Sequence, residues 1–343
     1  MKRTILILSI CFTVAVALNS CKKVGVSDPI FIEFKTPAGW PQPTYDFSQN
    51  PLTQQGIDLG RALFYDTRLS IDGKVSCGTC HQQFAAFTTY DHPQAHGVNN
   101  THTERNAPGI FNMAWQREFM WDGRIKNLDD VPAAHITNKI DMGETMEGVI
   151  KKLKFDADYR RLFRAAFGDD EMNEKRIGKA ISQFVLTIVS AESKYDKVKA
   201  GTASFTLPEQ LGYYIFKQKC AACHQEPLFT DLSYRNIGIP IDNALKDYGR
   251  MRVTAKSADS LLFKVPSLRN AEPSYPYGHD GRFYSFYNIL DHYRSSVING
   301  PTTDPLLKNK ISLTNFEIGQ LDAFLRTLTD SSVINNAKFT PHH

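Results

Sequence analysis

Two copies of a five-residue pattern hold the side chains best suited to chemistry. They read Cys77-Gly78-Thr79-Cys80-His81 and Cys220-Ala221-Ala222-Cys223-His224. In Cys-x-x-Cys-His, the two thiols add to the vinyl groups of a haem and the adjacent histidine binds its iron. Zinc sites and thioredoxin-like pairs also use Cys-x-x-Cys, but neither needs a histidine at this place. The motifs predict two covalently bound c-type haems, attached through Cys77, Cys80, Cys220 and Cys223, with His81 and His224 as proximal iron ligands.

The other two of the six cysteines, Cys11 and Cys21, lie near the start of the chain. Lys2 and Arg3 precede an apolar run over residues 5–18, which is typical of a secretory signal and short for a membrane span. The sequence Leu18-Asn19-Ser20-Cys21 resembles a bacterial lipobox, which implies cleavage before Cys21 and lipidation of its thiol. A simple signal peptide or an uncleaved anchor is the alternative. We expect a signal peptide over residues 1–20 and a periplasmic, membrane-anchored lipoprotein.

Charge and composition exclude one large class of partner. The formal net charge is +4, and neither a run of like charges nor a low-complexity tract is present, so we expect no nucleic-acid partner. Residues 21–45 mix proline, glycine and charge without a helical period, which predicts a tether between the lipid and the folded body.

Helical patterns dominate the rest of the chain. Amphipathic segments over residues 55–65 and 208–219 precede the two motifs, and residues 173–199 carry one long helical pattern. Thr314 and Glu317 form a capping box before a further apolar stripe. We predict a mainly α protein with two cytochrome c-like haem domains packed against each other, over residues 46–203 and 204–332.

Several stretches beyond the motifs resemble the bacterial di-haem cytochrome c peroxidase family, which includes MauG-like members. They are residues 59–70, Arg105-Asn106-Ala107-Pro108, Trp121-Asp122-Gly123-Arg124, Val265-Pro266-Ser267-Leu268-Arg269-Asn270 and Pro276-Tyr277-Gly278-His279-Asp280-Gly281. The resemblance runs from about residue 51 to about residue 330. It implies that the haem held by His81 reacts with peroxide, that the haem held by His224 passes or stores electrons, and that Trp121 lies between them.

The resemblance also implies a set of distal residues, and here the chain departs from its relatives. Where the family has a glutamate before a methionine, this chain has Asp141-Met142, so we expect Asp141 to move the peroxide proton over a shorter reach. His135 occupies a place where proline is frequent; it could polarise peroxide, bind the iron or lie in a surface loop. His96 is a candidate distal ligand of the first haem, with a solvated loop as the alternative reading.

At the place of the second haem's usual methionine ligand, the chain has Tyr293, with His292 as the alternative ligand. MauG resembles this arrangement. A phenolate would stabilise ferric iron and lower the haem potential, whereas a methionine raises it. The same resemblance implies a calcium ion between the domains, held by Asn106, Ser274 and Pro276, for which oxygen ligands are suitable.

We therefore predict a di-haem peroxidase that reduces hydrogen peroxide to water with electrons from a small periplasmic cytochrome c or similar donor. Asp141, Trp121 and His135 are its candidate catalytic residues. A MauG-like oxidase acting on a protein side chain is one alternative, and Tyr293 favours it. A non-catalytic electron-transfer protein is another, favoured by His135 and by the change to Asp141. The oligomeric state is left open, with a homodimer as one option.

Overall fold

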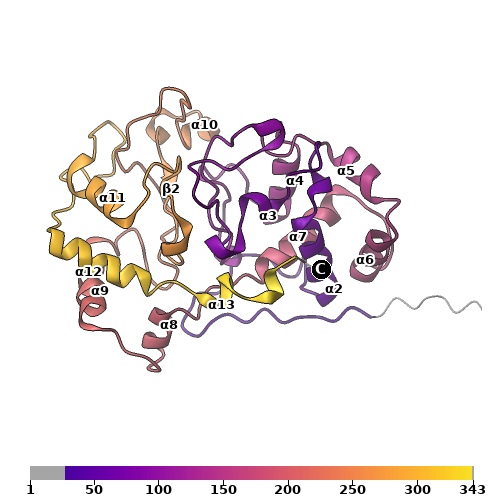
Figure 1. The fold of residues 1–343 in the computed structure, drawn as a ribbon, viewed down its shortest axis with the longest axis horizontal. Helices are drawn as coiled ribbons and strands as arrows, with labels where there is room; N and C mark the ends of the chain where they lie inside the picture. Colours follow the sequence, from indigo (N-terminus) through magenta and orange to yellow (C-terminus); the bar gives the residue numbers. More distant parts are fainter. Residues whose placement is uncertain (1–27, 342–343) are drawn as a thin grey trace, which may run out of the picture.

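The computed structural model describes residues 28–341, and the predicted signal peptide and Cys21 lie outside them. Two helical lobes stand side by side, with the earlier part of the chain in one and the later part in the other (Figure 1). The expected mainly α fold is confirmed. The helices are α2 (Gln54–Tyr65), α3 (Cys77–Cys80), α4 (Val131–Ile136), α5 (Met146–Leu153), α6 (Ala157–Phe167), α7 (Glu174–Leu186), α8 (Lys194–Lys199), α9 (Leu207–Lys219), α10 (Met251–Thr254), α11 (Phe286–Asp291), α12 (Asn315–Arg326) and α13 (Ser331–Ile334).

Strands are a minor part of the described residues. Strand β1 (Tyr234–Arg235) pairs antiparallel with β2 (Phe263–Lys264), with Tyr234 opposite Lys264 and Arg235 opposite Phe263. A π-helical turn, His292–Ser296, follows α11 directly. Such turns are frequent at functional sites, and this one carries Tyr293.

The two lobes repeat one helix crossing. In the first lobe α2 packs against α7, and in the second α9 packs against α12. A glycine lies at each crossing: a Cβ added to Gly60 would lie 1.9 Å from the Ala180 carbonyl oxygen, and one added to Gly212 would lie 1.9 Å from the Gln320 carbonyl oxygen. Helices α2 and α9 each precede a haem-binding motif in the chain, so these contacts help to position the motifs in their lobes.

Each lobe has its own apolar core. The first is built mainly from buried residues between Leu59 and Ile188, and the second from buried residues between Tyr195 and Leu328. The end of the chain returns to the first core, where Val333 and Phe339 are buried. The last described residues accordingly lie beside α2 (Figure 1). The domain boundary at residue 203 stays a prediction.

The expectation of one long helix over residues 173–199 was wrong, because α7 ends at Leu186 and α8 begins at Lys194. Ser190, between them, is fully buried. Its backbone nitrogen donates to Asn112 Oδ1 at 2.8 Å and its hydroxyl donates to Asp330 Oδ2 at 3.2 Å. These distant partners replace helical hydrogen bonds, and a capping box of Ser193 and Asp196 starts α8.

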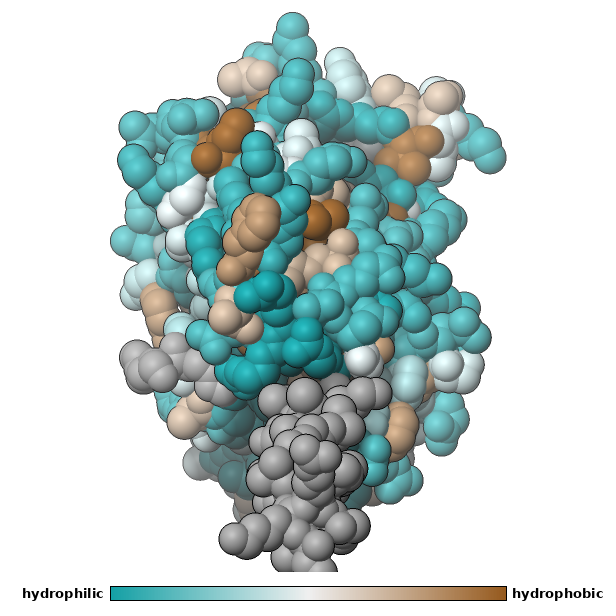
Figure 2. Space-filling model, turned by 90° about the vertical axis from the view of Figure 1, so that its right-hand side faces the viewer, coloured by the Kyte–Doolittle hydropathy of each residue, from teal (hydrophilic) through white to brown (hydrophobic). Residues whose placement is uncertain are grey.

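The helices predicted over residues 55–65 and 208–219 are confirmed as α2 and α9. Thr53 caps α2 by accepting from the Gly56 nitrogen, and Thr314 and Glu317 form the expected capping box at the start of α12. Figure 2 shows the face of the first lobe turned away from the second; outside the atoms drawn grey, it is mostly hydrophilic with separate apolar residues. Within residues 28–341, none of the helices is long and apolar enough to cross a membrane.

Candidate functional site

The first motif forms the short helix α3, which a capping box of Ser76 and Thr79 starts. The Nδ1 atom of His81 lies 2.8 Å from the Phe87 carbonyl oxygen. A carbonyl oxygen only accepts, so Nδ1 carries the proton and Nε2 is the nitrogen left to bind a metal. Burial lowers the pKa of His81 to about 4, which keeps the imidazole neutral, the form that ligates iron.

The second motif repeats this arrangement after α9. His224 Nδ1 donates to the Phe229 carbonyl oxygen at 3.2 Å, and burial lowers the pKa of His224. Burial also raises the pKa of the Cys77 and Cys220 thiols to about 12. All four motif cysteines are free of disulfides, as attachment to a haem requires.

A cavity of about 590 Å³ opens beside the second motif. Its size is in the range of cofactor sites, roughly 300–1,000 Å³. The wall is largely apolar, and Cys220, Cys223 and His224 line it together with Val265 and Leu290. An apolar cavity that presents two thiols and a neutral imidazole suits the thioether bonds and iron ligand of a c-type haem.

Tyr293 lines the same cavity. Burial raises the pKa of its phenol, and the charges of Cys220 and Cys223 act in the same direction, which places the side chain close to the attachment thiols. The Nε2 atom of its neighbour His292 forms a hydrogen bond with the Ile237 carbonyl oxygen at 2.8 Å. Of the two candidate ligands, Tyr293 is therefore the one that faces the cofactor cavity.

Near the first motif, the structure brings His135 and Asp141 together. His135 lies in α4, and its Nδ1 is 2.8 Å from Asp141 Oδ2 in the turn that follows. Their side chains are 32% and 13% exposed, so the pair is reachable from solvent. Burial is the main cause that raises the pKa of the Cys80 thiol, and the charge of Asp141 raises it further. The charges of His135 and Asp141 also affect the pKa of His81, which the first lowers and the second raises.

His96 comes close to the first motif through its backbone, because its carbonyl oxygen lies 3.7 Å from Cys80 Sγ. The imidazole itself is exposed. Its ring centroid lies 4.9 Å from that of His92 and 4.8 Å from that of His102. The structure therefore places this side chain among surface histidines, and its role as an iron ligand stays a prediction.

Trp121 and the proposed calcium ligands lie together in the cavity wall. The Trp121 indole donates to the Asn106 carbonyl oxygen at 2.8 Å, and Asn106 Nδ2 donates to the Pro93 carbonyl oxygen at 3.1 Å. Asn106, Ser274 and Pro276 all line the cavity. The sequence positions expected to hold calcium thus come together, and the ion itself stays a prediction.

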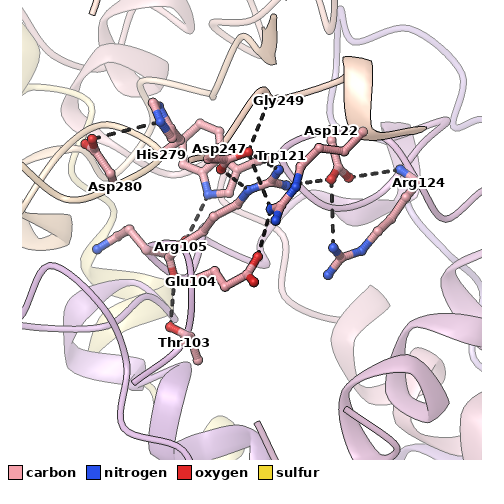
Figure 3. A network of polar contacts seen from close by, with 12 residues as sticks. Thr103, Glu104, Arg105, Trp121, Asp122, Arg124, Asp247, Gly249, His279 and Asp280 are labelled. Atoms are coloured by element: carbon pink, nitrogen blue, oxygen red, sulfur yellow. Dashed lines mark hydrogen bonds and ion pairs between the residues drawn. The ribbon is translucent and has the colours of Figure 1, made fainter. Parts of the chain in front are cut away.

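A buried ion-pair network beside Trp121 was not predicted from the sequence (Figure 3). Arg105 Nη1 lies 2.6 Å from Asp122 Oδ2, and its Nε lies 2.6 Å from Asp247 Oδ2. The arginine therefore joins the two lobes next to the residue expected between the haems. The sequence held one indication of this network: Arg105 directly precedes Asn106, and Asp122 directly follows Trp121.

Comparison with known proteins also points to a protein with two haems. A sequence model described as di-haem cytochrome c peroxidase matches residues 54–204. The methylamine utilization protein MauG of Methylophilus methylotrophus is 33% identical over 319 residues, covering 90% of this chain and 91% of that protein. The cytochrome c551 peroxidase of Nitrosomonas europaea is 34% identical over 276 residues, covering 79% of each chain.

Among solved structures, a MauG-like protein associated with microbial copper homeostasis superposes with a TM-score of 0.82 at 30% identity, over 90% of this chain and 99% of that one. The two Cys-x-x-Cys-His motifs are consistent with the two haems of this family. The chain belongs to the di-haem cytochrome c peroxidase and MauG family.

Proposed function

We propose that the protein is a hydrogen peroxide-dependent di-haem oxidase that draws its electrons from a side chain of a protein partner. The observation that carries this proposal is Tyr293 in the wall of the cavity that also presents Cys220, Cys223 and His224. When bound, the haems supply the electron transfer to peroxide that protein side chains alone cannot perform. Cys77, Cys80 and His81 would hold one haem, and the second motif the other.

We expect Asp141 and His135 to handle protons at the first haem site. Reduction of one hydrogen peroxide to two waters takes up two protons and two electrons. The Asp141 carboxylate, bonded to His135 and partly open to solvent, can take up a proton and return it. His135 supports this role as the hydrogen-bond partner that orients the carboxylate.

Tyr293 separates this proposal from an ordinary cytochrome c peroxidase. An oxygen ligand lowers the haem potential, whereas a methionine ligand raises it and suits acceptance of electrons from small cytochromes. A low potential at the second haem favours retention of oxidising equivalents until a suitable side chain is offered. The similarity to proteins named MauG, at 33% identity over most of the chain, supports the same reading.

Reduction of peroxide with electrons from a small periplasmic cytochrome c is the second candidate. It is supported by relatives named cytochrome c peroxidases, among them the 34% identical protein of Nitrosomonas europaea. Both candidates use the same first haem site and differ in the donor. The family is periplasmic in bacteria, and we propose in addition that Cys21 carries a lipid that anchors this member to a membrane.

The deciding experiment compares donors. The holoprotein receives one equivalent of peroxide, and the retained oxidising equivalents are back-titrated with ascorbate over time. In parallel, steady-state oxidation of reduced cytochrome c is measured for the wild type and for Tyr293→Met. We expect the wild type to retain two equivalents and turn over cytochrome c slowly, and the variant to turn over faster. Fast cytochrome c turnover by the wild type would favour the second candidate, and two irons inert to peroxide would contradict both.

A further inference from the structure

Two tyrosines from different lobes meet at the surface between the haem-binding motifs. The ring centroids of Tyr90 and Tyr275 lie 5.1 Å apart at 65°. Tyr90 is 37% exposed, and its ring lies 5.3 Å from that of Phe84, which is 56% exposed. The pair is therefore accessible to a partner protein.

Each tyrosine is one residue away from a haem-binding site. Thr89, which precedes Tyr90, donates through its hydroxyl to the Cys80 carbonyl oxygen at 3.1 Å. Ser274 and Pro276, which flank Tyr275, line the cavity of the second motif. The turn Gln83–Ala85 also packs against the turn Glu272–Ser274 across the lobes. The pair thus connects both sites to the surface at one place.

We propose that the Tyr90–Tyr275 pair is the surface site at which electrons from the partner's side chain enter the protein. This rests on the proposed peroxide-dependent function and adds the residues that connect it to solvent. Because the pair lies at the surface, each phenol can release its hydroxyl proton to water as it loses an electron. Phe84 provides an apolar contact beside the pair at which a partner's aromatic side chain can rest.

The chemistry balances with hydrogen peroxide as the oxidant. Two phenols each lose one electron and one proton, and one peroxide takes up both to become two waters. With a reductant present, the phenols are restored by two electrons and two protons from it. Without one, the two phenoxyl rings are close enough to couple: a carbon–carbon bond forms between them, and the linked pair is lighter by two hydrogen atoms.

The test uses the holoprotein with one equivalent of hydrogen peroxide and no reductant. Peptides are then searched by mass spectrometry for a Tyr90–Tyr275 link lacking two hydrogens, and dityrosine fluorescence is recorded. We expect the link in the wild type, its loss in Tyr90→Phe and Tyr275→Phe, and its suppression by ascorbate. Tyr214→Phe is the matched control, because Tyr214 is 58% exposed and lies on the outer side of α9.

Peroxide consumption is measured in the same samples, which separates the two proposals. Consumption without the link, or with equal oxidation of Tyr214, would overturn the tyrosine proposal and leave the proposed function standing. Absence of consumption would overturn both. A link that forms in the wild type and in Tyr214→Phe, but in neither variant of the pair, supports the proposal.

Discussion

His135 Nδ1 lies 2.8 Å from Asp141 Oδ2, next to the motif that presents His81. This hydrogen bond joins His135 and Asp141, which the sequence analysis had treated as separate candidate residues. An imidazole held by a carboxylate is oriented by it, and its Nε2 is the nitrogen left for other partners. The pair thus has the parts of a proton relay at the site where peroxide is expected to react.

Replacing Asp141 tests that relay. We expect Asp141→Asn to lower the rate of reaction with peroxide by about 10²–10⁴-fold, the usual contribution of a positioned acid–base group. Stopped-flow absorbance of the haem bands measures it. Asp141→Glu keeps the carboxylate and serves as the control, with a much smaller loss. An Asp141→Asn variant as fast as the wild type would remove Asp141 from the mechanism.

Tyr293→Met is expected to raise the reduction potential of the second haem, because a thioether ligand favours ferrous iron. The shift should be on the order of 100 mV, well inside the ~0.8 V range that axial ligands cover. Spectroelectrochemical titration measures it without any substrate. Tyr284→Phe, at a tyrosine that is 51% exposed, is the control and should leave both potentials unchanged. An unchanged potential in Tyr293→Met would show that this phenol does not bind the iron.

Arg105→Ala is expected to destabilise the protein by about 3–5 kcal/mol at pH 7, because it leaves two buried carboxylates without their cation. Burial opposes the ionised form of Asp247, but the hydrogen bonds and charge of Arg105 outweigh it and hold the pKa below 3.8. A lowered folded-state pKa stabilises the protein above the unfolded value and stops doing so as the pH falls through the folded value.

The difference in free energy of unfolding between wild type and Arg105→Ala should therefore shrink as the pH falls below about 4. Chemical denaturation at several pH values measures it. Arg124→Ala, whose side chain is 42% exposed and 3.8 Å from Asp122, is the control and should change stability little. A difference that stays constant with pH would show that ionisation of Asp247 is not involved.

The glycines at the helix crossings make a second stability test. Alanine normally favours a helix over glycine by about 1 kcal/mol. At Gly60 and Gly212, however, the new Cβ would lie 1.9 Å from a carbonyl oxygen of the facing helix. We expect Gly60→Ala and Gly212→Ala each to destabilise by about 1–3 kcal/mol, the usual effect of overpacking.

Gly319 offers the matched control, because it lies in α12 with nothing within 4 Å of its added Cβ. Gly319→Ala should be neutral or stabilising by up to about 1 kcal/mol. Thermal unfolding compares the three variants. Equal effects at all three positions would show that the close approach of the helices does not require glycine.

Calcium can be tested through the type of ligand that each residue offers. Asn106 would bind through its side chain, whereas Ser274 and Pro276 would bind through backbone carbonyls. Elemental analysis of the holoprotein should therefore find calcium in the wild type and in Ser274→Ala but a loss of it in Asn106→Ala. Because the Asn106 carbonyl oxygen accepts from the Trp121 indole at 2.8 Å, removal by a chelator should also change tryptophan fluorescence. A wild type without calcium would contradict the site.

Local patterns determined much of this protein from the sequence alone. Thiol and imidazole spacing identified both haem-binding motifs. The helical period predicted α2 and α9, and the period together with a capping box predicted α12. These signals are readable because each depends on residues within a few positions of one another. The combination of short motifs along the chain likewise indicated the family, since each motif is a continuous stretch of residues.

Tertiary structure alone decided the contacts between distant residues. Asn112 and Asp330 break the helical pattern at Ser190, although the local period continues through it. Arg105 meets Asp247, and Tyr90 meets Tyr275, across the two lobes. Such pairs depend on how the cores pack and which groups are taken out of water together, and no short-range pattern in the chain records that.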